Sequence, residues 1–115
     1  MNPREMAVKT LEEKGEVAIR CNGNSMRSLI APKELIHLIK VEPSVLRVGD
    51  AVFVKINGAY QVHKLTAIDG ARYQISNNKG WVNGWVSANC IYGLCVQVED
   101  RIVVSAEEMA KRAGK

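Results

Sequence analysis

The chain has 115 residues, 47% of them apolar and 24% charged, which suits one soluble domain with a single modest core. Its net charge of +4 is mild and its lysines and arginines are scattered, which disfavours nucleic-acid binding. No apolar run approaches the roughly 18 to 20 residues that span a bilayer, and the acidic N-terminal segment does not resemble a secretory signal. We therefore expect no membrane anchor.

The first expected element is a short helix at the N-terminus. Asn2 followed by Pro3 is typical of an N-cap and a first helical position. Apolar residues as far as Leu11 supply one face, and Gly15 is expected to end the helix.

From residue 16 onward, short β-rich runs alternate with turn residues. Asn57-Gly58 between two such runs is the strongest short-range hairpin signal. The segment NNKGWVNGW is expected to be rich in turns, one of them at Asn83-Gly84. The expected strands, in chain order, cover residues 16–21, 34–41, 51–56, 59–68, 71–76, 89–98 and 101–104.

A second helix is expected over residues 106–113, because Ser105 and Glu108 have the spacing of a capping box. There is no repeat, linker or low-complexity tract. The prediction is therefore a single mainly β domain over residues 1–115 with a short helix at each end.

Ser25 is the candidate nucleophile, since it lies between an Asn-Gly-Asn turn and Met26. A serine hydroxyl needs a positioned base. His37 is explained as an ordinary strand histidine, which leaves His63 and Lys64 in the second arm of the hairpin. Successive side chains of a strand point to opposite faces, so only one of these two can face Ser25. Composition and spacing do not decide which.

The motifs GNSM, LRVGDAVFV, YQVHKL and IYG follow one another between residues 23 and 93. This order resembles the superfamily of signal peptidases and LexA-type self-cleaving repressors, over about residues 16–98. The resemblance implies a small fold of coiled antiparallel β-sheets, a nucleophile at Ser25, and a Gly-Asp pair before a strand. That pair is Gly49-Asp50, for which we expect a structural role in a turn.

The resemblance also favours one of the two candidate bases. Repressors and bacterial signal peptidases use a lysine, whereas endoplasmic-reticulum, archaeal and sporulation signal peptidases carry a histidine in its place. Val62-His63-Lys64 resembles the second branch, which implies that His63 is the base and that Lys64 points to the other face. The implied chemistry is acyl transfer, with the oxyanion held by the Ser25 backbone N–H and a neighbour such as Asn24.

One part of the family pattern is missing. An acidic residue is expected downstream to orient the histidine, but residues 76–85 contain no Asp or Glu. Amides orient imidazoles in some hydrolases. The candidates to replace the acid are Asn77, Asn78, Asn83 and, in a turn beyond the strand, Asp69. Either the activity is weak, or an amide suffices, or the site is inactive.

Two functions thus stay open. One is a soluble serine peptidase that cleaves a polypeptide with a Ser25–His63 dyad, for example a stand-alone core from a phage-like genome. The other is a catalytically inactive module that keeps the fold and binds an extended peptide by β-addition. Neither implies a metal or cofactor. The three cysteines match no zinc spacing and suggest a reducing, cytoplasmic compartment. Some superfamily relatives dimerise through terminal strands, so a homodimer is a further expectation.

Overall fold

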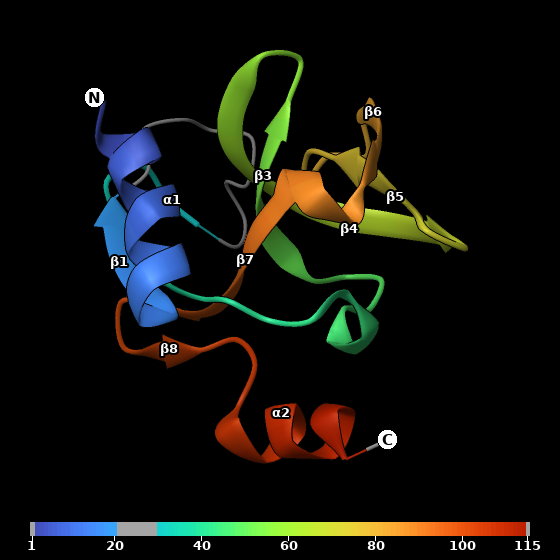
Figure 1. Cartoon of the computed structure of the whole chain (residues 1–115). Coiled ribbons are helices and arrows are strands. Elements are labelled where there is room, and N and C mark those ends of the chain that lie inside the picture. The colour runs from blue at the N-terminus through green and yellow to red at the C-terminus, as the bar shows by residue number, and fades with distance from the viewer. Residues whose placement is uncertain (1, 21–29, 115) are drawn as a thin grey trace.

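A computed structural model describes residues 2–20 and 30–114 (Figure 1). The helices are α1 (Pro3–Lys14) and α2 (Ala106–Ala113), with 3₁₀ turns η1 (Pro43–Val45) and η2 (Ala88–Cys90). The strands are β1 (Glu16–Arg20), β2 (Leu35–Ile39), β3 (Ala51–Ile56), β4 (Ala59–Asp69), β5 (Arg72–Ser76), β6 (Val82–Ser87), β7 (Ile91–Val98) and β8 (Arg101–Ile102).

These strands form one antiparallel sheet in the order β1-β2-β7-β3-β4-β5-β6, and β8 pairs with β7. The predicted hairpin is confirmed, because β3 and β4 are joined at Asn57-Gly58, where both residues have positive φ (53° and 79°). The mainly β class with a helix near each end is confirmed as well. None of the helices in the described ranges is long and apolar enough to cross a membrane.

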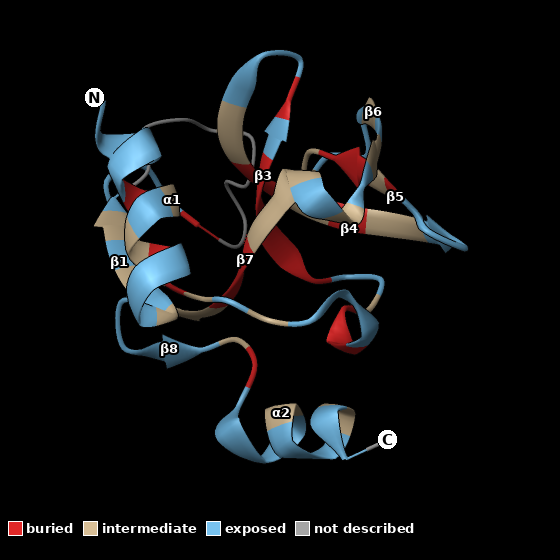
Figure 2. Ribbon diagram, in the orientation of Figure 1, coloured by how far each residue is buried: buried red, intermediate tan, exposed pale blue. Residues whose placement is uncertain are grey.

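The centre of the sheet is buried on both faces, as Figure 2 shows for β3. Phe53 belongs to one apolar cluster, which α1 covers with Leu11. The alternate residues Val52 and Val54 belong to a second cluster on the other face. The first half of β4, residues 59–64, pairs with β3, and the second half pairs with β5, so His63 and Lys64 lie where β4 passes from one neighbour to the other.

The expected turn at Asn83-Gly84 is wrong, because both residues lie inside β6. The turn occurs earlier in the chain, where the Asn77 side-chain oxygen accepts hydrogen bonds from the backbone N–H groups of Lys79 and Trp81 (2.9 and 3.0 Å). This Asn side chain closes the loop locally and lets the chain pair again from Val82. β6 is the last strand of the sheet.

Candidate functional site

The predicted nucleophile lies outside the described residues. Ser25 falls within residues 21–29, as do Asn24 and Met26, so the roles given to these three residues stay predictions.

His63 lies near the middle of β4, opposite Val52 of β3, and is only 3% exposed. Its Nδ1 atom lies 2.6 Å from the backbone carbonyl oxygen of Val62. A carbonyl oxygen can only accept, so Nδ1 carries the proton and donates to it. This tautomer places the imidazole lone pair on Nε2, which is the atom a general base would use.

The environment of His63 also favours the neutral ring. Burial lowers the pKa of His63, because the charged imidazolium loses hydration, and the smaller effect of the Val62 carbonyl acts in the opposite direction. An unperturbed histidine has a pKa of about 6.5. The ring is therefore neutral, and able to accept a proton, at pH 7.

Lys64 occupies the other face of the strand, as the alternation predicted. It lies opposite Ala51 of β3, which packs in the cluster beneath α1, whereas the Val52 partner of His63 packs in the second cluster. On its other side Lys64 lies opposite Ser76 of β5. The two candidate bases are thus separated by the sheet.

The four residues proposed to orient His63 lie in different places, and two of them are accounted for by their positions or hydrogen bonds. Asp69 ends β4 as an exposed residue six positions beyond His63, about 20 Å away along an extended strand, so it does not reach the ring. Asn77 uses its side-chain oxygen in the β5–β6 turn. The roles of Asn78 and Asn83 as supporting residues stay predictions. The partner observed for Nδ1 is the Val62 carbonyl.

Asp50 has the structural role that was expected, together with a partner that the sequence did not reveal. Its carboxylate accepts a hydrogen bond from the Arg47 N–H (2.8 Å), which closes the turn before β3. The same carboxylate forms a bidentate ion pair with the Arg112 guanidinium of α2, with N···O distances of 2.9 and 3.2 Å. Sixty-two residues separate the two, and no local pattern points to such a pair.

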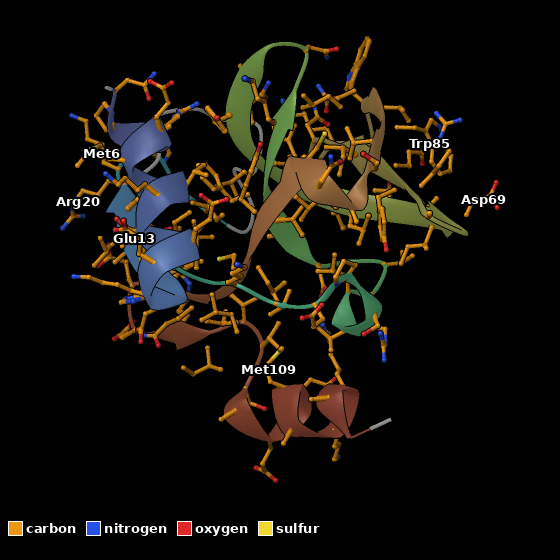
Figure 3. All side chains as sticks on the ribbon, viewed as in Figure 1. Met6, Glu13, Arg20, Asp69, Trp85 and Met109 are labelled. Atoms are coloured by element: carbon orange, nitrogen blue, oxygen red, sulfur yellow. The ribbon has the colours of Figure 1, made fainter. Side chains whose placement is uncertain are left out.

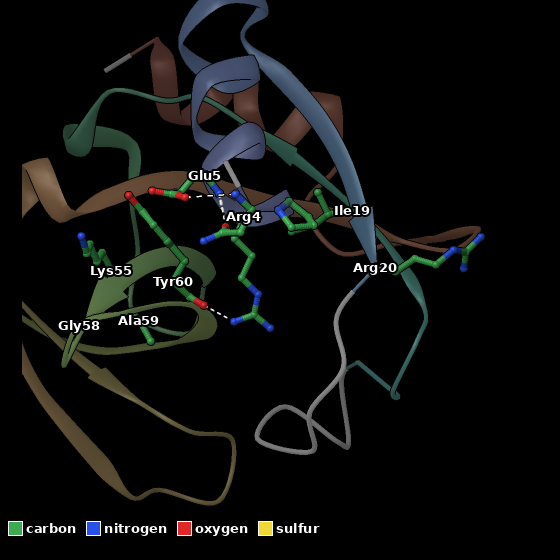
Figure 4. Close-up of a pocket in the computed structure, with 10 residues that line it drawn as sticks. Arg4, Glu5, Ile19, Arg20, Lys55, Gly58, Ala59 and Tyr60 are labelled. Carbon is green, nitrogen blue, oxygen red and sulfur yellow. Dashed lines mark hydrogen bonds between the residues drawn. The ribbon is translucent and has the colours of Figure 1, made fainter.

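A pocket of about 830 Å³ opens between the start of α1, the end of β1 and the β3–β4 hairpin (Figure 4). Arg20, the last described residue before the segment that contains Ser25, contributes to its wall. We call this cavity the α1 pocket. It is lined by Asn2, Pro3, Arg4, Glu5, Ile19, Arg20, Lys55, Gly58, Ala59 and Tyr60. Arg4 binds the backbone carbonyl of Tyr60 across 56 residues of sequence, and no local pattern predicts such a contact, so the pocket was not predicted.

Within residues 2–20 and 30–114, no group of three or more His, Cys, Asp or Glu side chains could hold a metal ion. In comparisons with known proteins, no protein-family model matches the chain and no curated protein matches it.

Proposed function

We propose that the protein is a serine peptidase in which Ser25 is the nucleophile and His63 its general base. The observation that supports this proposal is the state of His63: buried, neutral, and held through Nδ1–H by a backbone carbonyl. This tautomer puts the lone pair of the ring on Nε2, the atom that a general base would use. The motif order described above supplies Ser25 as its partner.

In the proposed reaction, Nε2 of His63 takes the hydroxyl proton as Ser25 Oγ bonds to the substrate carbonyl carbon. The imidazolium then gives that proton to the amine as the peptide C–N bond breaks, leaving an ester on Ser25. Water, activated by the same ring, hydrolyses the ester and restores both residues. Throughout, the Val62 carbonyl keeps Nδ1 protonated.

The Val62 carbonyl takes the orienting position that a carboxylate has in a Ser-His-Asp triad. A carbonyl dipole stabilises an imidazolium less than a full negative charge does. The proposed enzyme should therefore be slow. The same feature favours the second candidate function, an inactive module that binds a peptide without cleaving it.

The test is covalent labelling with a fluorophosphonate, which reacts with activated serines, followed by mass spectrometry to find the modified residue. We expect labelling of the wild type at Ser25 and none in Ser25→Ala. His63→Gln should slow the reaction about 100-fold or more, as loss of a general base does. Ser28→Ala and His37→Gln are the matched controls, and both should react like the wild type. Equal labelling of wild type and His63→Gln would reject His63 as the base.

The low pKa of His63 gives a second, independent readout. Between its lowered folded pKa and about 6.5, the unfolded chain binds a proton that the folded protein excludes, so the free energy of unfolding should fall as pH drops below about 6.5. Above that value this contribution is constant. Urea unfolding of wild type and His63→Gln from pH 8 to about 5 should show the difference. The labelling rate should stay constant until the pH reaches the lowered folded pKa of His63, because the folded ring is neutral above it, and should fall only below that pKa. A parallel pH dependence in both proteins would contradict a buried neutral ring.

A further inference from the structure

The α1 pocket carries more positive than negative side chains. Among the described residues that line it, the cations are Arg4, Arg20 and Lys55, and the one carboxylate is Glu5. That carboxylate accepts a hydrogen bond from the Asn2 backbone N–H (3.2 Å) and so belongs to the cap of α1. The remaining charge on the wall of the pocket is positive.

Two of the three cations can still take an anionic partner. Arg20 lies 3.5 Å from the Glu99 carboxylate, and its side chain points away from Tyr60 in Figure 4. Arg4 and Lys55 have no carboxylate within 4 Å in the described part of the chain. Arg4 donates one N–H to the Tyr60 carbonyl, whereas a guanidinium carries five.

Tyr60 contacts both cations. The Lys55 ammonium lies 5.1 Å from the centre of its ring, and Arg4 binds its backbone carbonyl. The ring itself packs against Phe53 and Tyr92, with centroid separations of 5.9 and 5.6 Å. An apolar ring with Lys55 over its face and Arg4 at the backbone carbonyl of the same residue suits a short aliphatic side chain that ends in a carboxylate.

We propose that the α1 pocket binds an acidic side chain of an extended peptide, with Arg4 and Lys55 as the residues that select it. A guanidinium presents paired N–H groups that match a carboxylate, and Lys55 adds a second positive charge. This inference rests on the proposed function, because the peptide is its substrate. Tyr60 packs against the cluster beneath α1, whereas Val52, the cross-strand partner of His63, packs in the second cluster, so the bound peptide must reach from one face of the sheet to the other. The β1 strand that forms one wall runs directly into the segment that carries Ser25.

The experiment uses the full chain with Ser25→Ala, so that no peptide is cleaved. Fluorescent eight-residue peptides, neutral except for one Glu, are compared with their Gln counterparts at every position by fluorescence polarisation. We expect Glu at one or two neighbouring positions to bind roughly 5-fold more tightly than Gln, as partly exposed ion pairs allow. The preference should shrink at about 1 M salt, where charges are screened within about 3 Å.

The variants Arg4→Gln and Lys55→Gln should each reduce the preference for Glu, and the double variant should abolish it. Lys55→Glu should reverse the charge preference, so that a peptide with Lys at that position binds more tightly than one with Glu. Lys9→Gln, an exposed residue of α1 outside the pocket, is the control and should keep it. No preference at any position, or a preference that survives in the double variant, would overturn the inference. A preference found in a protein whose Ser25 resists labelling would support the pocket and reject the peptidase.

Discussion

The two terminal helices are attached to the same sheet by different forces. α1 buries Ala7 and Leu11 completely in the apolar cluster that contains Phe53. α2 has no buried residue, and only Met109 packs against the second cluster, pointing from the helix toward the sheet in Figure 3. Its other attachment is the ion pair between Arg112 and Asp50, whose side chains are 10% and 5% exposed.

This difference predicts how each helix responds to change. An apolar contact is non-directional and scales with buried area, so α1 should come off only when the core itself opens. A buried ion pair depends on both partners, and removal of one leaves the other charge poorly solvated. α2 should therefore detach as a unit while the sheet remains folded, since its release lets water reach Asp50.

The largest effect is expected from Leu11→Ala. Leu11 is fully buried, and its truncation removes apolar contacts and leaves a cavity, which costs about 2 to 5 kcal/mol in the free energy of unfolding. Met6→Ala in the same helix, where the side chain is 51% exposed, should change it by no more than about 0.5 kcal/mol. Urea unfolding measures both. Similar losses for the two variants would show that α1 is not attached through its core face.

A smaller effect is expected from Arg112→Gln. It removes the bidentate ion pair with Asp50 and the hydrogen bond to the Val45 carbonyl. The attachment of α2 should lose about 1.5 to 3 kcal/mol of stabilisation, as is usual for charged hydrogen bonds. Hydrogen exchange should speed up in α2 while β3 and β4 keep their protection. Lys111→Gln is the control, since it removes the same charge from the neighbouring exposed position. Unchanged protection in α2 would mean that Met109 alone holds the helix.

The smallest effects are expected at the two helix caps. Asn2→Ala breaks a capping box in which the Asn2 side chain and the Glu5 side chain each bind a backbone N–H, at a cost of about 1 kcal/mol in global unfolding. Ser105 binds the Glu108 N–H at 3.0 Å, but the Glu108 carboxylate binds Arg112. Ser105→Ala should therefore affect exchange within α2 only. A global loss from Ser105→Ala as large as that from Asn2→Ala would remove the distinction between the helices.

Local sequence patterns predicted most of the secondary structure. The two Asn-Gly pairs show the limit of such patterns, because only one of them forms a turn. Asn57-Gly58 forms the predicted turn, because the strands on either side pair with each other. The same dipeptide at Asn83-Gly84 lies within β6, where Gly84 pairs with Ile75 of β5 and Asn83 lies at a shift in the register, since the Asn77 side chain has already closed the turn. The dipeptide permits a turn, and the partners of the flanking residues decide whether one forms.

At the candidate site, too, one feature was predictable from local sequence and another depended on packing. Strand alternation alone predicted that His63 and Lys64 lie on opposite faces. Which of the two is buried, and that the Val62 carbonyl binds its ring, depended on how β4 packs against its neighbours. The expected orienting groups were downstream amides and a carboxylate, whereas the group that binds Nδ1 is the backbone carbonyl of the preceding residue.

The sequence by itself determined the mainly β class, the helix ends and the alternation along each strand, because capping, turn geometry and side-chain period act between residues close in the chain. Tertiary structure alone decided the Asp50–Arg112 pair, the α1 pocket and the lowered pKa of His63. These depend on contacts between distant segments and on the water that such contacts exclude, which local sequence patterns do not encode.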